Sequence, residues 1–171
     1  LAGLDRLLEG KGKLLFLVPL VALANQKEED FRAEYGHLAE VSIRVGSSRI
    51  REDGVQFEPD ADVIVGTYEG IDHALRTGRD LGNIGTVVID EVHTLGEGER
   101  GHRLDGLISR LKYYCEVDRT VAQRHDGRPG AHDAGDTQWI YLSATVGNTS
   151  ELAENLGAQL IEFEERPVPI E

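Results

Sequence analysis

Four short runs of the sequence are almost wholly apolar, and each has the length of one β-strand. They are LLFLV at 14–18, VIV at 63–65, TVVI at 86–89 and WIYL at 139–142. A strand that is apolar throughout is buried on both faces, whereas a strand with one exposed face alternates. Helical patterns lie between these runs. The sequence therefore predicts a three-layer α/β domain with a mainly parallel sheet.

Periodicity and helix-ending residues place the other elements. Residues 41–45 alternate as a strand does, and 160–163 are expected to form the last strand. Pro19 is expected to open a helix, and Thr67 to cap another. The polar, Gly-rich segment 118–138 shows no periodicity and predicts a mobile surface loop. The predicted helices cover 1–9, 19–35, 68–76, 103–115 and 150–156.

Length and composition exclude several classes of protein. A chain of 171 residues is long enough to bury a core as one domain without disulfides. Cys115 is the only cysteine, so an internal disulfide and a cysteine-rich zinc site are excluded. No apolar run approaches the roughly 18 residues of a membrane span, and no secretory signal opens the chain. These observations predict a cytoplasmic protein.

The charge balance is strongly acidic. The chain has 31 acidic and 18 basic residues, a net charge of −13, and only four of the basic residues are lysines. Such a surface is typical of salt-loving archaea, where high ionic strength screens the self-repulsion; the alternative is an ordinary acidic domain. The chain contains no methionine and opens with leucine. We therefore expect a fragment of a longer protein.

Two acidic residues, Asp90 and Glu91, directly follow the apolar run at 86–89, and Val92 and His93 come next. In open parallel sheets, ligands bind beyond the carboxyl ends of the strands. Two adjacent carboxylates at the tip of a buried strand are costly unless a positive group lies beside them, and a magnesium nucleotide supplies one. There, one acid would hold Mg²⁺ while its neighbour orients or deprotonates water. The alternative is an acidic cap on a helix.

The next apolar run delivers Ser143-Ala144-Thr145 to the end of its strand. If the two strands are neighbours, these hydroxyls can hydrogen-bond to His93 or to the acidic pair. A helix is also expected to begin just after the first strand, where free backbone N–H groups can hold a phosphate. The chemistry of the chain is therefore expected at the carboxyl ends of the strands.

Four segments in order, VPLVALANQK, VGTYEGIDHAL, VVIDEVHTLG and YLSATVGN, resemble the first RecA-like domain of superfamily-2 DEAD/DEAH-box helicases. The tail SELAENLGAQLIEFEERPVPIE is similar to the archaeal Ski-like branch, which includes archaeal DNA-repair helicases. The resemblance runs from about residue 14 to residue 171. It implies an N-terminally truncated P-loop NTPase domain over 1–163, and a linker at 164–171 toward a second RecA-like domain.

The resemblance assigns roles to the strand-end residues. Asp90 would coordinate Mg²⁺ through water, and Glu91 would be the general base or would position the attacking water. His93, with Ser143 and Thr145, would couple the nucleotide state to movement of the second domain. The implied activity is ATP-dependent unwinding or remodelling of DNA or RNA, with ATP hydrolysed to ADP and phosphate.

The resemblance also implies contacts with the backbone of a single strand. Tyr68 stands where the family pattern has proline, and its side chain would either stack on a base or pack against the domain. Recognition through the backbone would be largely independent of sequence. The positions that match the strand-gripping motifs are Pro19, Leu20 and Ala22, then Gly46 and Ser47, and then Thr67 and Glu69.

The Walker A pattern G-x-x-x-x-G-K-[ST] does not occur in this chain, and the turn GKGK at 10–13 lacks its outer residues. The isolated chain is therefore expected to hydrolyse no ATP. One alternative is a degenerate, non-catalytic module that binds nucleic acid or protein. Retention of Asp90, Glu91, His93, Ser143 and Thr145 argues against decay, and the SAT element and RPV tail argue against a transporter motor.

Overall fold

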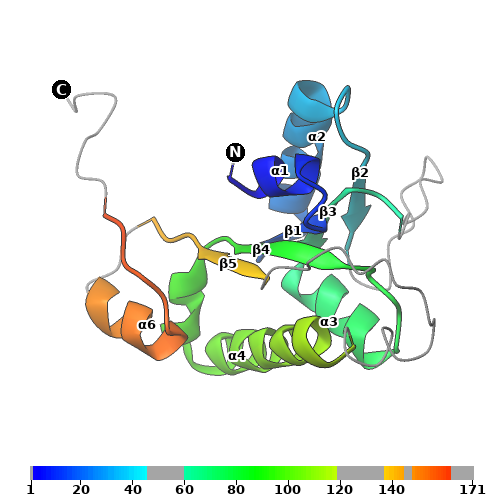
Figure 1. Cartoon of the computed structure of the whole chain (residues 1–171). Coiled ribbons are helices and arrows are strands. Elements are labelled where there is room, and N and C mark those ends of the chain that lie inside the picture. The colour runs from blue at the N-terminus through cyan, green and yellow to red at the C-terminus, as the bar shows by residue number, and fades with distance from the viewer. Residues whose placement is uncertain (1, 46–59, 119–136, 145–147, 163–171) are drawn as a thin grey trace.

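The computed structural model describes residues 2–45, 60–118, 137–144 and 148–162. Five strands form one sheet in the order β2-β3-β1-β4-β5, and every neighbouring pair is parallel. This topology confirms the predicted α/β fold with a parallel sheet (Figure 1). The strands are β1 (Lys13–Val18), β2 (Val41–Arg44), β3 (Val63–Thr67), β4 (Ile84–Ile89) and β5 (Gln138–Tyr141).

Helices cover both faces of the sheet, as Figure 1 shows. On one face lie α1 (Ala2–Leu8) and α2 (Val21–Tyr35), and on the other α3 (Tyr68–Arg76) and α4 (Gly98–Tyr113). The remaining helical elements are the 3₁₀ turn η1 (Val92–Gly96), the π-helical turn η2 (Tyr114–Asp118) and the short helix α6 (Thr149–Leu156).

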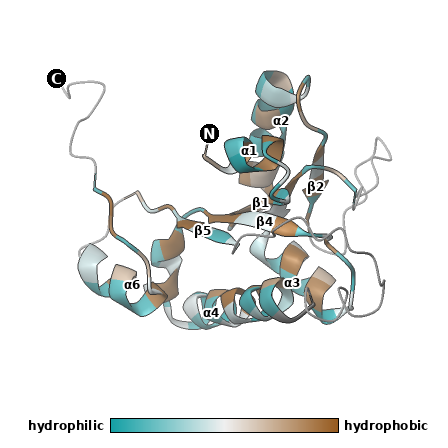
Figure 2. Ribbon diagram, viewed as in Figure 1, coloured by the Kyte–Doolittle hydropathy of each residue, from teal (hydrophilic) through white to brown (hydrophobic). Residues whose placement is uncertain are grey.

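The central strand β1 explains why its sequence is apolar at successive positions. Leu15 and Leu17 pack into the cluster beneath α3 and α4, whereas Leu14, Phe16 and Val18 pack into the cluster beneath α1 and α2. All five side chains are at most 8% exposed. Figure 2 shows the apolar residues concentrated in the sheet and on the helix faces turned toward it. Burial on both faces therefore produces the three layers.

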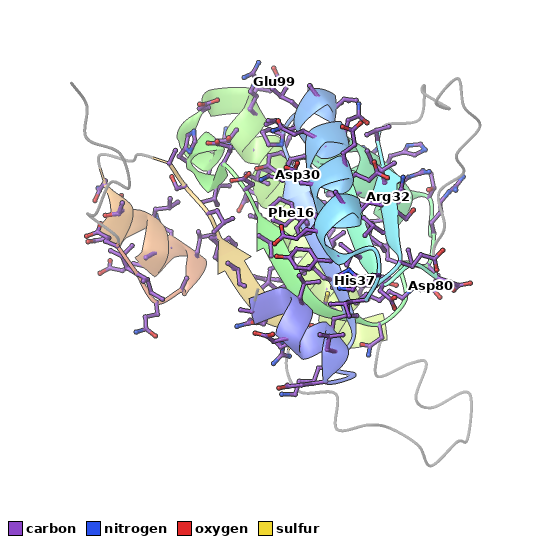
Figure 3. The ribbon with its side chains drawn as sticks, turned by 90° about the horizontal axis from the view of Figure 1, so that it is seen from above. Phe16, Asp30, Arg32, His37, Asp80 and Glu99 are labelled. Carbon is purple, nitrogen blue, oxygen red and sulfur yellow. The ribbon has the colours of Figure 1, made fainter. Side chains whose placement is uncertain are left out.

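An aromatic contact joins α2 to the sheet. The rings of Phe16 and Phe31 meet edge to face with their centroids 5.3 Å apart. Figure 3 shows Phe16 beside α2, between the helix and the strands. Such pairs favour edge-to-face geometry because the ring edge is positive and its face negative. The helix is thus fixed over β1, the strand that leads into Pro19.

Several elements differ from the sequence prediction, among them two helix starts and one strand. The helix expected from Pro19 begins at Val21, because Leu20 is still extended. The helix expected from residue 103 begins at Gly98. The strand expected at 160–163 is wrong over its described part, since residues 160–162 join no described strand. Ile161 there is 71% exposed, so its apolar side chain is not part of the core.

Several predictions fall on segments outside the described residues. These include Gly46, Ser47 and Thr145, and the linker at 164–171. Of the loop expected at 118–138, residue 118 instead closes η2 and residue 138 opens β5, while 119–136 lie outside the described residues. The division at residue 163 stays a prediction. Within the described part of the chain, no helix is long and apolar enough to cross a membrane.

Candidate active site

The ends of β4 and β5 lie side by side, in register at Ile89 and Tyr141. Beyond the strands, Leu142 N–H donates to the Ile89 carbonyl at 2.8 Å, and Val92 N–H donates to the Leu142 carbonyl at 2.9 Å. These bonds bring the segment after β4 against the segment after β5. The condition that the two strands be neighbours, on which the predicted role of Ser143 rests, is therefore met.

The acidic pair is held by backbone contacts. Asp90 N–H donates to the Leu17 carbonyl at 2.9 Å, and Asp90 Oδ1 accepts from Glu91 N–H at 3.0 Å. Glu91 has φ 58° and ψ 40°, and no other described residue except glycine has positive φ. That left-handed conformation costs about 1–2 kcal/mol and persists only where the surroundings impose it. The hydroxyl of Thr94 contributes by donating to the Glu91 carbonyl at 2.7 Å.

His93 joins the two strand ends. Its Nδ1 lies 3.3 Å from Glu91 Oε2 and 3.3 Å from Ser143 Oγ. An unprotonated Nδ1 can accept from the Ser143 hydroxyl, whereas a protonated Nδ1 can donate to the Glu91 carboxylate. The His93 and Glu91 side chains are 29% and 35% exposed, so solvent and a ligand can reach both. The structure thus brings Asp90, Glu91, His93 and Ser143 together, as the sequence predicted.

Sequence reasoning missed the contact of Tyr68 with this cluster. Tyr68 is the first residue of α3, and its hydroxyl donates a hydrogen bond to the backbone carbonyl of Asp90. Its half-buried ring packs against the core beneath α3 and α4. Burial first, and then the charges of Asp90 and Glu91, raise the pKa of the Tyr68 hydroxyl well above its usual range. Of the two alternatives for Tyr68, packing is confirmed.

The described positions that are predicted to contact the nucleic-acid backbone lie at or just beyond the carboxyl ends of β1 and β3, two neighbouring β-strands of the sheet. Val18 pairs with Thr67, so the segments after β1 and β3 emerge side by side. Leu20 is 60% exposed and the Ala22 and Glu69 side chains are also exposed. Thr67 is 3% exposed and its hydroxyl accepts from Gly70 N–H at 3.1 Å, so it caps α3 as predicted.

The Asp90 carboxylate is an oxygen donor of the kind that Mg²⁺ binds. Among the described residues, no three acidic, histidine or cysteine side chains gather as a metal cage. Mg²⁺ does not need such a cage, because it is held by one or two carboxylates together with water and substrate phosphates.

The turn at 10–13 lies at the opposite end of the sheet from the acidic pair, since Lys13 is paired with Ile84 at the start of β4. Lys11 is engaged there by Glu9 at 2.5 Å.

The family model described as DEAD/DEAH box helicase matches residues 1–153 of the chain. The chain belongs to the DEAD/DEAH box helicase family. The family resemblance drawn from the four sequence segments is thereby confirmed.

Relatives of this helicase domain include archaeal helicases. A probable ATP-dependent helicase of Methanocaldococcus jannaschii is 50% identical over 173 residues, covering 100% of this chain and 19% of the relative. The ATP-dependent DNA helicase Hel308 of Pyrobaculum calidifontis is 38% identical over 164 residues, covering 95% of this chain and 20% of the relative. The chain thus spans about a fifth of each relative, and the similarity to archaeal Ski-like helicases is confirmed.

Solved structures support the RecA-like fold of the helicase domain. The DUF1998 helicase MrfA superposes with a TM-score of 0.60 at 23% identity, over 90% of this chain and 23% of that protein. Dbp5 of S. cerevisiae superposes with a TM-score of 0.56 at 20% identity, over 85% of this chain and 33% of that protein. At these identities the likeness shows the fold alone.

Proposed function

We propose that the chain forms part of the first motor domain of an ATP-dependent helicase that unwinds or remodels DNA or RNA. The observation that carries the proposal is the cluster of Asp90, Glu91, His93 and Ser143, which two adjacent strand ends hold within hydrogen-bond reach. One archaeal relative is named a probable ATP-dependent helicase and another an ATP-dependent DNA helicase, and these names support the same activity.

In this proposal the acidic pair acts on a magnesium nucleotide. Bound Mg²⁺ neutralises charge on the phosphates and on the leaving group. Asp90 would hold the ion, through water as the family resemblance implies, and its Oδ1 accepts a hydrogen bond from Glu91 N–H. Glu91 orients the attacking water and accepts its proton, and water attack releases ADP and phosphate from ATP. Because the backbone of Glu91 is left-handed, its side chain leaves the chain in a different direction from that of a residue with the usual right-handed helical backbone.

The histidine and the hydroxyl residues couple this chemistry to motion. His93 Nδ1 lies 3.3 Å from both Glu91 and Ser143. A movement of the Glu91 carboxylate would therefore shift His93 and, through it, Ser143 at the end of β5. Thr145, two residues further on, has the same role in the proposal. The second RecA-like domain of a longer protein is the partner that moves.

In the proposal, the protein contacts the nucleic-acid backbone at the carboxyl ends of β1 and β3. A single-stranded nucleic acid crosses the segments after β1 and β3, which lie side by side because the ends of the two β-strands are paired. Contacts to phosphate and sugar carry no sequence information, so binding is largely sequence-independent. The residues proposed for this track are Pro19, Leu20, Ala22, Gly46, Ser47, Thr67 and Glu69.

The proposed motor domain occupies 1–163, and 164–171 lead toward the second motor domain. The setting is the cytoplasm of a salt-adapted archaeon, supported by the acidic composition and by the archaeal relatives. High salt screens the net charge of −13, so the global charge does not prevent local contact with a polyanion.

The test uses a chimeric helicase, in which this chain replaces the matching segment of the M. jannaschii relative. We expect ATP hydrolysis that single strands stimulate, and unwinding of a tailed duplex; parallel DNA and RNA substrates assign the nucleic acid. The chain alone should bind single strands weakly and hydrolyse no ATP. A chimeric helicase that binds a partner but hydrolyses nothing would instead support the non-catalytic module.

A further inference from the structure

Two hydrogen bonds hold the peptide bond between Asp90 and Glu91 from opposite sides. Its carbonyl oxygen, on Asp90, accepts from the hydroxyl of Tyr68. Its N–H, on Glu91, donates to Asp90 Oδ1 at 3.0 Å. Because a peptide unit is planar, fixing both its oxygen and its N–H fixes the orientation of the whole unit. The direction in which the Glu91 side chain leaves the backbone follows from that orientation.

The orientation has to be imposed on Glu91. A left-handed backbone is costly for a residue with a Cβ, and rotation of the 90–91 peptide would let Glu91 relax toward a regular conformation. Asp90 supplies one constraint from its own side chain. Tyr68 supplies the other from α3, 22 residues away in sequence. The position of the Glu91 carboxylate therefore depends on where α3 places the Tyr68 hydroxyl.

The same turn of α3 carries the residues proposed to meet the nucleic acid. Tyr68 lies between Thr67, the N-cap of α3, and the exposed Glu69. The turn is compact, because the Thr67 hydroxyl accepts from Gly70 N–H and a Cβ on Gly70 would lie 2.7 Å from the Arg44 carbonyl. A displacement of this turn therefore moves Tyr68 together with its neighbours.

We propose that Tyr68 is a positioning residue that links the single-strand track to the proposed general base. The proposal rests on the proposed function. When a strand binds beside Thr67 and Glu69, the start of α3 shifts, and the Tyr68 hydroxyl carries the shift to the 90–91 peptide. Glu91 reaches its catalytic orientation through this contact. The proline of the family pattern has no donor for it, so this link belongs to chains with tyrosine at this position.

The chain offers two matched controls for removal of a tyrosine hydroxyl. The Tyr141 hydroxyl is buried near the same strand ends and has no hydrogen-bond partner among the described residues. The Tyr114 hydroxyl donates to Asp80 at 2.6 Å, far from the acidic pair. Tyr68→Phe, Tyr141→Phe and Tyr114→Phe all keep the ring and remove only the oxygen.

The first measurement is amide hydrogen exchange in the 171-residue chain. Tyr68→Phe removes the hydrogen bond to the Asp90 carbonyl and so leaves the 90–91 peptide freer to rotate away from Asp90 Oδ1. Exchange of the Glu91 amide should therefore rise about tenfold relative to the amides of β4, which corresponds to the contribution of one hydrogen bond. Tyr141→Phe and Tyr114→Phe should leave that ratio unchanged. If exchange rises equally at all amides of Tyr68→Phe, the hydroxyl stabilises the whole fold and not the 90–91 peptide in particular, and the proposal is overturned.

The second measurement is the turnover of the chimeric helicase with and without a saturating oligonucleotide. Tyr68→Phe should reduce the ratio of stimulated to unstimulated turnover at least about fivefold. The two control variants should keep the ratio of the unsubstituted chimera. If both rates of Tyr68→Phe fall in parallel, or neither changes, the link is overturned. If the unsubstituted chimera shows no stimulation, the proposed function itself fails, and the link falls with it.

Discussion

Ser143 Oγ lies 3.3 Å from Nδ1 of His93, although 50 residues separate the two in the chain. The contact exists because β5 is added directly beside β4, so both residues emerge at one edge of the sheet. His93 in turn reaches Glu91 at 3.3 Å. The two strand ends are therefore joined through the imidazole of His93.

Replacing Ser143 and Thr145 by alanine should separate the two activities of the chimeric helicase. We expect ATP turnover to stay within about threefold of the unsubstituted protein and unwinding to fall roughly tenfold or more, because the proposal assigns both residues to coupling and not to the chemistry, and Ser143→Ala removes the contact with His93. Steady-state hydrolysis and strand separation are measured on the same preparation. Equal losses in both would place these hydroxyls in the chemistry itself.

Replacing Asp90 by asparagine should weaken the binding of Mg²⁺ in the chimeric helicase. The variant keeps one oxygen of the side chain but loses the negative charge that attracts the ion. Turnover should fall strongly at low Mg²⁺ and recover in part as Mg²⁺ is raised. Asp30→Asn is the control, because Asp30 is an exposed carboxylate on α2 (Figure 3). A loss that no concentration of Mg²⁺ recovers would contradict the assignment.

Asp80 should contribute a small, pH-dependent share of stability. Hydrogen bonds from the Tyr114 hydroxyl and then from Gly82 N–H lower the pKa of the Asp80 carboxyl. A lowered pKa in the folded state stabilises above the unfolded pKa, and this stabilisation is lost as the pH falls through the folded value. Asp80→Asn should thus cost on the order of 0.5 kcal/mol at pH 7, since the carboxyl is exposed and screened.

Urea unfolding of the unsubstituted chain and of Asp80→Asn should show this difference at pH 7. The difference should shrink at an acidic pH below the lowered pKa of Asp80, where protonation of the folded carboxyl removes the contribution. A difference in the free energy of unfolding that is the same at both pH values would mean that the hydrogen-bond geometry, and not the charge, makes the contribution.

The melting temperature should rise with salt. At a net charge of −13 the folded chain repels itself, and at 0.01 M salt the Debye length is about 30 Å, comparable to the domain. Melting curves from dilute buffer to molar KCl should therefore shift upward, most steeply below about 0.1 M. A melting temperature indifferent to salt would remove the salt-adapted interpretation and leave an ordinary acidic domain.

The sheet and the residues at its edge could be predicted because they depend on local patterns. The runs at 14–18, 63–65 and 86–89 are buried on both faces, whereas the run at 139–142, in the edge strand β5, is only half-buried and ends at the exposed Leu142. The acids and the serine directly follow two of these four runs. The turn after β3 was predictable for the same reason, since Thr67 is a favourable cap. Sequence alone therefore predicted that the acids and the serine lie at the carboxyl ends of strands, as they do, and these two strands are neighbours.

Contacts between distant elements could not be predicted in this way. The hydrogen bond from Tyr68 to the Asp90 carbonyl depends on how α3 packs beneath β4. The left-handed backbone of Glu91 is likewise imposed by contacts with its surroundings. An apolar pattern also cannot show whether a strand has a partner, and for this reason residues 160–162 were predicted wrongly.

Glu91→Gln tests the central claim most directly, with the affinity for Mg·ATP measured beside turnover in the chimeric helicase. Glu99→Gln is its control, because Glu99 is an exposed acid at the start of α4 (Figure 3). Glutamine keeps the size of the side chain and removes the base. We predict an ATP dissociation constant within about threefold of the unsubstituted protein and turnover reduced about 10²-fold or more. Turnover that stays near that of the unsubstituted protein would show that Glu91 is only an acidic residue at the end of β4, and would contradict the catalytic assignment.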